Sequence, residues 1–391
     1  MTLLIVLFWI ALFLVFYTYI GYGILLYVAV RIREALRPQK PLVDPSPWPD
    51  ITLLIAAYNE EEVVAEKMAN CLALDYPADK LHIVWITDGS NDRTNDLLAT
   101  YPEVTVFFRP ERQGKTAALN RAFSLLTTDY VICTDANTML NRAATREITR
   151  LFSDPKVGCV AGEKRVMETT NGNAAATEGL YWRYESKLKA WDDRLYSACG
   201  AAGELFAVRR QLYQPVEEDT LLDDFIISMR IAMQGYRIAY CRTAFACETP
   251  SANMQEEGKR KRRIAAGGLQ AIARLTPLLN PFRYGVFAWQ YISHRVLRWS
   301  LTPILLVLLL PLNVLLACMA ENKLLYLIIL LVQGIFYAAA IAGWLLARQG
   351  KRNRLLAVPY YFLFMNLNVF RGMSYLASHR GRGVWEKARR A

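Results

Sequence analysis

The sequence lacks the residue patterns of several common binding sites. None of its seven cysteines belongs to a Cys-x-x-Cys pair, and several lie in apolar runs: Cys71, Cys133, Cys159, Cys199, Cys241, Cys247 and Cys318. Zinc sites and disulfide-stabilised secreted domains use closely spaced cysteines, so we expect reduced core cysteines instead. Gly114-Lys115-Thr116 is not a P-loop, because residue 109, where that motif requires glycine, is Arg. A lysine at position 115 can still bind phosphate.

Charged side chains are absent from Thr2 to Val30, a run longer than the roughly 20 residues that cross a bilayer. Basic residues follow it, at positions 31, 33, 37 and 40. A signal peptide instead has its positive charge before a shorter apolar core and ends at a small-residue cleavage site. We therefore expect an uncleaved transmembrane helix at 1–30 and a basic, Pro-rich linker at 31–49.

Apolar density returns near the C-terminus, in a chain whose hydrophobic fraction of 54% and mean hydropathy of +0.15 are high for a soluble protein. The stretches 300–319 and 324–347 indicate a helical hairpin in the membrane, although buried helices of a soluble protein are the alternative. The stretch 355–377 carries Pro359, Asn366, Asn368 and Arg371, and polar groups are costly in lipid. We expect a C-terminal membrane bundle at 300–377 in which this last stretch spans, re-enters or lies at the interface.

The placement of Lys and Arg predicts the orientation. The basic residues after the first span and those at 348–354 should both be cytosolic, which puts the middle of the chain on the cytosolic side of a bacterial inner (plasma) membrane. The basic tail at 378–391 conflicts with this orientation if 355–377 is a complete span. Because the surplus charge of +11 lies largely beside membrane segments, we expect membrane lipids and no nucleic acid as partners.

The middle of the chain contains short, β-rich apolar runs with helix-compatible stretches between most of them: 51–56, 81–87, 104–108 and 130–134. This alternation favours an α/β fold with a mainly parallel sheet and helices on both faces. Ligands of such sheets bind beyond the carboxyl ends of the strands, where the polar segments 58–60, 88–92 and 135–137 lie. Any one of them can be a simple turn or cap, but three in succession favour a nucleotide site.

Asp135 and Asn137 offer oxygen ligands two positions apart after the fourth run, so their side chains can face the same way. Magnesium and manganese bind one or two carboxylates and complete their coordination with phosphate oxygens and water. We therefore expect Mg²⁺ or Mn²⁺ here, bound together with a diphosphate.

Two charged segments occur in the second half. Asp223 and Asp224 open a helical pattern, where they either cap the helix or act as a general base, because adjacent carboxylates raise one another's pKa. The basic run 259–263 is either a solvated or lipid-facing helix surface or a clamp for diphosphate. Residues 251–299 are expected to form basic and interfacial helices, with anchors at the membrane surface: Trp289, His294, Arg295, Arg298 and Trp299.

Together these motifs resemble the family 2 glycosyltransferases, in particular their membrane-bound cellulose-synthase-like and hyaluronan-synthase-like branch. The resemblance covers residues 50–270 by motif and the flanking spans by architecture. It implies a GT-A-type nucleotide-sugar domain at 50–250 with transmembrane helices at both ends. It also implies donor-binding roles for several residues: Tyr58, Asn59, Glu60, Asp88, Lys115, Arg260 and Arg263. Asp135-Ala136-Asn137 takes the place of the family's metal motif, with Asn where Asp is usual.

The same resemblance assigns residues on the acceptor side. Segments 178–185 and 200–203 are similar to the family's acceptor region, so Trp182, Gly203 and Glu204 are expected there, although the spacing around Trp182 also fits ordinary helix packing. Asp223-Asp224 looks like the ED motif, in which the second acid is the base. The Q-x-x-R-W segment falls on 260–264, where Arg263 matches and Ile264 replaces the Trp.

We therefore predict a membrane-bound inverting glycosyltransferase. It would move a sugar from a nucleotide-diphosphate donor, with UDP as the expected nucleotide, to a glycan or lipid-linked acceptor in envelope or extracellular polysaccharide synthesis. Asp224 would take the acceptor proton, while a metal at Asp135 and the cation of Arg263 stabilise the departing diphosphate. The alternatives are a processive synthase that also translocates its product, a catalytically silent membrane scaffold, and a transporter built on the C-terminal spans.

Overall fold

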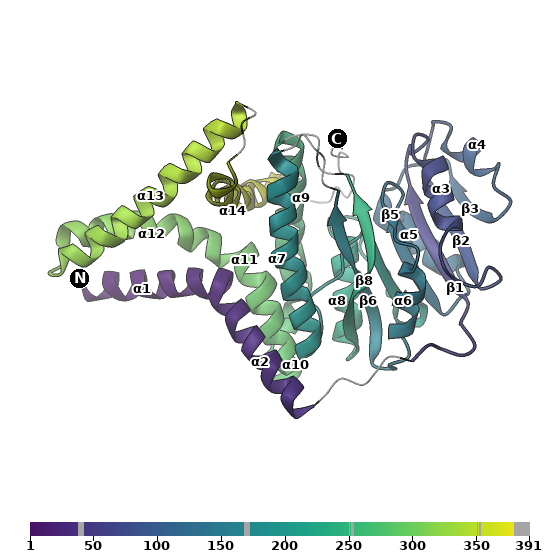
Figure 1. Ribbon diagram of the computed structural model, residues 1–391, viewed down its shortest axis with the longest axis horizontal. Coiled ribbons are helices and arrows are strands. Elements are labelled where there is room, and N and C mark those ends of the chain that lie inside the picture. The colour runs from purple at the N-terminus through teal and green to yellow at the C-terminus, as the bar shows by residue number, and fades with distance from the viewer. Residues whose placement is uncertain are drawn as a thin grey trace.

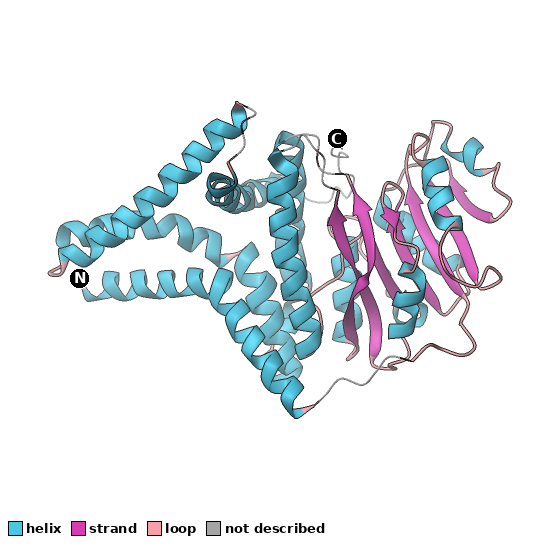
Figure 2. Cartoon of the chain, in the orientation of Figure 1, coloured by secondary structure: helices cyan, strands magenta, loops and turns pink. Residues whose placement is uncertain are grey.

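The computed structural model has two parts, a bundle of long helices and an α/β domain (Figures 1 and 2). The structure describes residues 1–37, 43–167, 173–249, 251, 254–349, 351 and 353–378, and for 173–181 it describes the backbone alone. Residues 38–42 of the expected linker and nearly all of the expected basic tail, from residue 379 onward, lie outside the described residues.

The α/β domain is built on one mixed, mostly parallel sheet of eight strands in the order β3-β2-β1-β4-β7-β6-β8-β5. Its strands are β1 (Ile51–Ala57), β2 (Leu81–Asp88), β3 (Val104–Arg109), β4 (Tyr130–Asp135), β5 (Met139–Leu140), β6 (Val157–Val166), β7 (Leu205–Arg209) and β8 (Arg237–Glu248). β1 pairs in parallel with β2 and β4, whereas β7 runs antiparallel to β4 and β6. The four strands expected from the sequence are confirmed, as is the α/β class.

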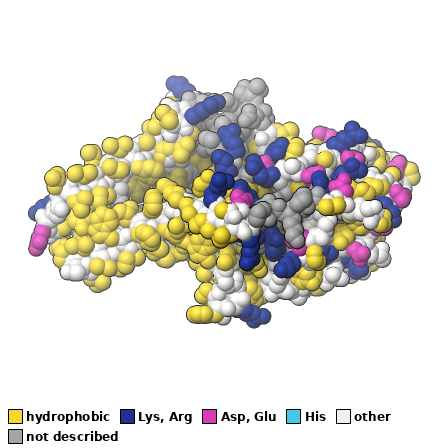
Figure 3. Space-filling model, turned by 60° about the horizontal axis from the view of Figure 1, so that its bottom comes forward, with side chains coloured by type: hydrophobic (Ala, Val, Ile, Leu, Met, Phe, Trp, Pro, Cys, Tyr) yellow, Lys and Arg dark blue, Asp and Glu magenta, His cyan; other side chains and the backbone are white. Residues whose placement is uncertain are grey.

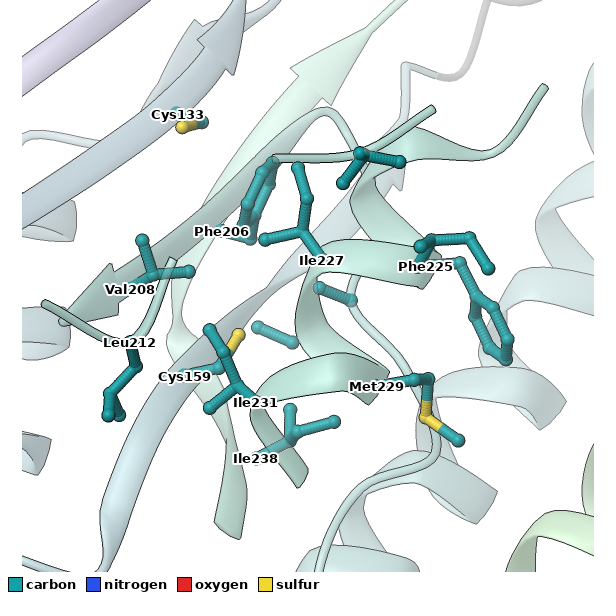
Figure 4. Close-up of a cluster of buried hydrophobic side chains, with 14 of the residues drawn as sticks. Cys133, Cys159, Phe206, Val208, Leu212, Phe225, Ile227, Met229, Ile231 and Ile238 are labelled. Atoms are coloured by element: carbon teal, nitrogen blue, oxygen red, sulfur yellow. The ribbon is translucent and has the colours of Figure 1, made fainter. Parts of the chain in front are cut away.

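Helices cover both faces of the sheet because side chains alternate along its buried strands. On β1, Leu54 faces one core while Leu53 and Ile55 face the other. The first core is closed by α5 (Lys115–Leu125), α8 (Asp223–Met233) and parts of the segments that follow the sheet. The second is closed by α3 (Val64–Leu72), α4 (Thr94–Leu98) and α6 (Ala144–Leu151). Figure 4 shows how α8 packs on the sheet: Ile227 and Ile231 lie beside Phe206, Cys159 and Ile238, which belong to β7, β6 and β8, whereas Phe225 points away from the strands.

The chain begins with a continuous helical segment of 35 residues, α1 (Thr2–Phe16), a π-helical turn η1 (Tyr17–Gly21) and α2 (Tyr22–Leu36). At 1.5 Å per residue this is about 52 Å long, more than the roughly 30 Å of a hydrocarbon core. α1 is exposed and apolar, whereas α2 turns away at η1 and lies against α7 (Asn173–Leu195) (Figure 1). The helix therefore continues past residue 30, where we placed the start of the linker. Arg33 and Glu34 sustain it by bonding to Arg194.

The segments after the sheet form the rest of the helical part. They are α9 (Met254–Arg274), the 3-10 turn η3 (Thr276–Leu279), α10 (Pro281–Tyr291), the π-helical turn η4 (Ile292–Val296), α11 (Leu297–Trp299), α12 (Leu301–Met319), α13 (Lys323–Arg348) and α14 (Arg354–Ser378). Three helical segments of the described chain are long and apolar enough to cross a membrane: Thr2–Leu36, Leu301–Met319 and Lys323–Arg348. Hydrophobic side chains cover this half of the molecule, while charged side chains gather on the other half and at the junction (Figure 3).

α14 is not one of these three candidate spans. It covers the stretch for which the sequence left open whether it spans, re-enters or lies at the interface. It runs across the bundle and packs on α9 and α13 (Figure 1). Asn366 and Asn368 are buried, whereas Arg371 is exposed. Asn366 Oδ1 accepts a 2.5 Å hydrogen bond from Tyr19, and the Asn366 and Asn368 amides donate to carbonyls one turn earlier. Contacts of this kind make polar residues tolerable beside lipid.

The residues expected as anchors at the membrane surface are instead partly in the interior. His294 is fully buried, with Nδ1 2.5 Å from Asp192 and Nε2 3.1 Å from Glu185. Arg295 and Arg298 also bind Glu185, at 2.7 and 3.3 Å. The interfacial interpretation is wrong for His294, because it is buried beside acids of α7 that are too far away in sequence to be recognised as partners.

Candidate active site

The carboxyl ends of β1, β2 and β4 meet at one edge of the sheet, and Asp88 organises the loop beside them. Its carboxylate accepts hydrogen bonds from the backbone amides of Gln113 at 3.1 Å and Gly114 at 2.6 Å. Gly114 has φ 98°, a conformation that disfavours other residues, and Lys115 begins α5 directly after it. Asp88 thereby fixes the turn that aims Lys115 at the edge of the sheet.

The segment after β1 lies beside the segment after β2. The Asn59 side chain exchanges hydrogen bonds with Asn91, at 2.8 and 3.0 Å, and the Glu60 amide donates to Thr94 Oγ1 at 2.8 Å. The guanidinium of Arg112 stacks 3.8 Å above the ring of Tyr58. The three expected donor residues therefore form one rim with the loop that Asp88 holds.

Lys115 reaches across the edge to the end of β4, where its Nζ lies 2.6 Å from Asp135 Oδ1. Although burial opposes the shift, the charges of Asp135, Asp223 and Asp224 raise the pKa of Lys115 above its ordinary value. Lys115 is therefore a permanent cation at this edge. In a site that binds a diphosphate, it is placed to bind a phosphate oxygen.

Of the two expected metal ligands, Asp135 ends β4 and Asn137 lies in the turn between β4 and β5. The Asp135 carboxylate is partly exposed, and a second carboxylate lines the same cavity: Asp223 Oδ2 is buried and has no hydrogen-bond partner among the described residues. Such hard oxygen ligands suit Mg²⁺ or Mn²⁺. The described residues around Asp135 do not form a three-ligand group, so an ion here would need phosphate oxygens to complete its coordination.

Asp223 and Asp224 form the first turn of α8, and Asp224 faces Lys115 across Gly203. A Cβ atom at Gly203 would lie 3.3 Å from Asp224 Oδ2 and 3.5 Å from Lys115 Nζ, so the absence of a side chain keeps the space open. Asp224 Oδ1 accepts a 2.8 Å hydrogen bond from the amide of Phe225. Burial, and then the charge of Asp223, raises the pKa of Asp224 to about 7. That value suits a general base near neutral pH.

One cavity of about 450 Å³ lies between the α/β domain and the helical bundle, and both acids at the start of α8 line it. The rim residues after β1 and β2, Asp88 and Asn137 are not among its lining residues. Lys115, Asp135, Gly203 and Asp224 lie on its sheet side. Its other walls come from α7, α9, α11 and α14, with contributions from η1, η4 and the start of α8. The cavity therefore joins this edge of the sheet to the helical bundle.

Arg263 and Ile264 of α9, which fall on the Q-x-x-R-W segment of the resemblance, line this cavity. Arg263 makes no hydrogen bond or ion pair within the described part of the chain, so its guanidinium is available to an anion. Arg260 is different, because it lies in a buried ion cluster, 3.5 Å from Glu204 and 3.8 Å from Glu257. Its position supports α9 more directly than it serves a phosphate.

Glu204 and Trp182, expected on the acceptor side, both border the cavity. Lys164 binds the Glu204 carboxylate and holds its pKa far below the usual range, against the effect of burial. The Trp182 ring lies 5.1 Å from Lys164 Nζ and 5.6 Å from Lys261 Nζ. The indole is thus held by cations at the cavity wall and presents an aromatic surface there.

Lys189 and Trp299 are among the cavity residues that the sequence did not indicate as site residues. Trp299 is seated on α9 where Gly268 leaves room, since a Cβ there would lie 2.4 Å from the indole, and its ring meets Phe225 edge to face at 5.1 Å. The sequence alone contains no signal for either residue, because a Trp before a span and a Lys within an amphipathic helix both have common structural explanations.

The matched family and relatives agree with this geometry. A family model described as "Glycosyltransferase like family 2" matches residues 49–267, more than half of the chain. Poly-beta-1,6-N-acetyl-D-glucosamine synthase of Staphylococcus aureus is 29% identical over 274 residues, which cover 67% of this chain and 64% of that protein. The probable glycosyltransferase YdaM of Bacillus subtilis is 26% identical over 245 residues, or 58% of this chain and 57% of that one. The match therefore spans less than two thirds of either relative.

Among solved structures, the mannosyltransferase PcManGT from Pyrobaculum calidifontis, in complex with GDP-Man and Mn²⁺, has a TM-score of 0.71 and 22% sequence identity. The match covers 95% of this chain and 99% of that one, so the likeness extends to the helices on both sides of the α/β domain. It supports the GT-A-type fold expected from the sequence motifs.

Proposed function

The chain belongs to glycosyltransferase family 2, and on that premise we propose that it transfers N-acetylglucosamine, in inverting fashion, from UDP-N-acetylglucosamine to a growing or lipid-linked glycan. The similarity to poly-beta-1,6-N-acetyl-D-glucosamine synthase supports this donor and a role in polysaccharide synthesis. Polysaccharide synthesis at a membrane also agrees with three apolar helices of spanning length.

One observation carries the proposed reaction: a carboxylate with a raised pKa and a set of cations line the same cavity. Asp224 is the base and Lys115 a cation on the sheet side of the cavity, and Arg263 is a cation on the wall that α9 forms. A base and an anion-stabilising group at one cavity are what a single displacement on a nucleotide sugar requires.

In the proposed reaction the acceptor hydroxyl attacks the anomeric carbon while Asp224 takes its proton. The bond between the anomeric carbon and the diphosphate oxygen breaks, and its electron pair leaves with UDP. Lys115 and Arg263 bind the diphosphate and stabilise the charge that it gains. Mg²⁺ or Mn²⁺ held at Asp135, with Asn137 and Asp223 nearby, would supply further positive charge to the same phosphates.

The remaining donor contacts in this proposal are made by the rim after β1 and β2. Tyr58, Asn59 and Glu60 would bind the nucleotide there, while Asp88 acts indirectly by holding the turn before Lys115. Trp182 and Gly203 border the space left for the acceptor. The cavity reaches α14 and η1, which favours an acceptor that approaches from the membrane surface.

For localisation we propose an integral protein of a bacterial inner membrane with its α/β domain in the cytosol. Basic residues at the end of α2 and after α13 support this orientation. Membrane lipids would contact the exposed apolar faces of α1, α12 and α13.

A purified, detergent-solubilised protein tests the proposal. We would incubate it with UDP-N-acetylglucosamine, UDP-glucose and GDP-mannose in parallel and measure the nucleotide released with and without N-acetylglucosamine oligosaccharides. Release of UDP from the first donor, increased by the oligosaccharide, is expected. Release from GDP-mannose alone would refute the proposed donor, and release from no donor would favour the scaffold alternative.

A further inference from the structure

Lys189 of α7 is a buried lysine that the mechanism above does not use. Only 5% of its surface is exposed, and the exposed part faces the cavity that contains Asp224. It makes no hydrogen bond or ion pair with any residue in the described ranges. An ammonium group without a partner is expensive to bury, so its retention at this position calls for a ligand.

Two acids near Lys189, Glu185 and Glu204, form ion pairs with other basic side chains. Glu185, one helical turn earlier, binds His294, Arg295 and Arg298. Glu204 binds Lys164 and Arg260. Lys189 therefore keeps its three donors for whatever enters the cavity.

The charges near Lys189 define the kind of ligand. Burial lowers its pKa, as does Arg295, whereas Glu185, Glu204 and Asp224 act in the opposite direction. Glu185 and Glu204 are paired with other cations, but Asp224 faces the same cavity with no ion pair among the described residues, and its charge would repel an anionic group beside Lys189. A neutral oxygen, such as a sugar hydroxyl or the carbonyl of an N-acetyl group, accepts a hydrogen bond from the ammonium without that repulsion.

We propose that Lys189 is an acceptor-binding residue that donates hydrogen bonds to neutral oxygens of the acceptor sugar and orients its hydroxyl toward Asp224. The proposal rests on the proposed glycosyl transfer and adds the chemistry of the acceptor subsite. During transfer the hydroxyl proton goes to Asp224, the acceptor oxygen bonds to the anomeric carbon, and UDP leaves with the electron pair of the broken bond. Lys189 keeps its proton throughout, and its charge favours the oxygen as negative charge develops on it.

The test compares Lys189→Met with Lys187→Met in the full-length protein. Methionine keeps the length of the lysine stem without its charge, and Lys187 is an exposed residue of the same helix. We would measure UDP binding, transfer from UDP-N-acetylglucosamine to an N-acetylglucosamine tetrasaccharide, binding of the fluorescently labelled tetrasaccharide, and the thermal unfolding midpoint.

K189M should lower kcat/KM for the tetrasaccharide about 10- to 100-fold, the loss expected for a hydrogen bond to a charged group. UDP binding should change less than about twofold, because the donor contacts of Lys115 and Arg263 remain. The unfolding midpoint should stay or rise, since an unpartnered buried charge is removed. K187M should match the wild type in all four measurements.

A lower unfolding midpoint in K189M would show that Lys189 has a structural partner and would overturn the proposal. Unchanged tetrasaccharide transfer and binding would overturn it equally. A wild type that releases no UDP would refute the proposed function, and tetrasaccharide binding would then decide about Lys189 alone. Equal binding by wild type and K189M, or binding by neither, would again overturn the proposal.

Discussion

Replacement of Asp224 by asparagine is the sharpest test of the proposed base. Asparagine has the same shape, and its Oδ1 can still accept the 2.8 Å hydrogen bond from the Phe225 amide, so the start of α8 should be preserved. Removing a half-buried charge next to Asp223 relieves repulsion, and the unfolding midpoint should not fall. The donor contacts at Lys115 and Asp135 also remain, so UDP binding should be nearly unchanged.

The size of the kinetic effect follows from the role of the base. General-base catalysis contributes about 10²- to 10⁴-fold, which is about 3 to 5 kcal/mol of transition-state stabilisation. With a pKa of about 7 for Asp224, about nine tenths of the wild type is ionised at pH 8. We therefore expect D224N to lose about two to four orders of magnitude in kcat at pH 8.

Single-turnover release of UDP, with UDP binding measured by calorimetry, separates this loss from a binding defect. Asp96→Asn is the matched control, because Asp96 is an exposed acid at the start of α4, on the other face of the sheet. It should behave as the wild type. A D224N protein that turns over within about threefold of the wild type while binding UDP normally would refute the assignment of Asp224 as the base.

Three further predictions follow from the site. The wild-type rate should rise with pH through about 7 as Asp224 loses its proton. Asp223→Asn should move this rise to lower pH, because it removes the neighbouring charge that raises the pKa of Asp224. A pH profile of kcat that does not move would contradict the effect of Asp223 on Asp224. Activity should require Mg²⁺ or Mn²⁺ and be lost in excess EDTA, with the Asp135→Ala variant needing more metal for half-maximal rate; full activity with metal content verified as nil would exclude an ion. With Ile264 in place of the family's Trp, the enzyme should hold the growing glycan weakly and add one or a few sugars per encounter. A chase of radiolabelled product with unlabelled donor measures the product length. A long polymer from the first turnovers would instead indicate that Trp299 supplies the missing aromatic surface.

Local patterns make the core of the α/β domain predictable. β1, β2 and β4 are short apolar runs that end in polar residues, and parallel strands bring such ends to one edge. That rule is sufficient to predict that Asp88 and Asp135 lie at the same edge. Asp223 and Asp224 are recognisable because they open a periodic apolar helix that must pack on the sheet.

Partners that are distant in the sequence are not predictable in this way. Nothing near Glu185 indicates that it binds His294, Arg295 and Arg298, which are more than a hundred residues away. The basic run that contains Arg260 looks uniform, yet the fold buries that residue among acids and leaves Arg263 at the cavity. The role of Lys189 cannot be predicted from the sequence for the same reason. Its lack of an ion pair among the described residues depends on which cations the neighbouring acids bind in the fold.

The packing of α2 has a practical consequence for work on this protein. Tyr22 and Leu26 of α2 are completely buried against Leu188 of α7, and the Tyr22 hydroxyl binds Asp192, the acid that also holds His294. Deleting the first 36 residues in the hope of a soluble enzyme would remove a wall of the catalytic domain itself. Such a truncation would expose an apolar strip on α7 and remove the Tyr22 hydroxyl from the buried carboxylate of Asp192. A membrane mimetic that preserves the whole N-terminal helix is therefore a condition for any assay that reports on the native site.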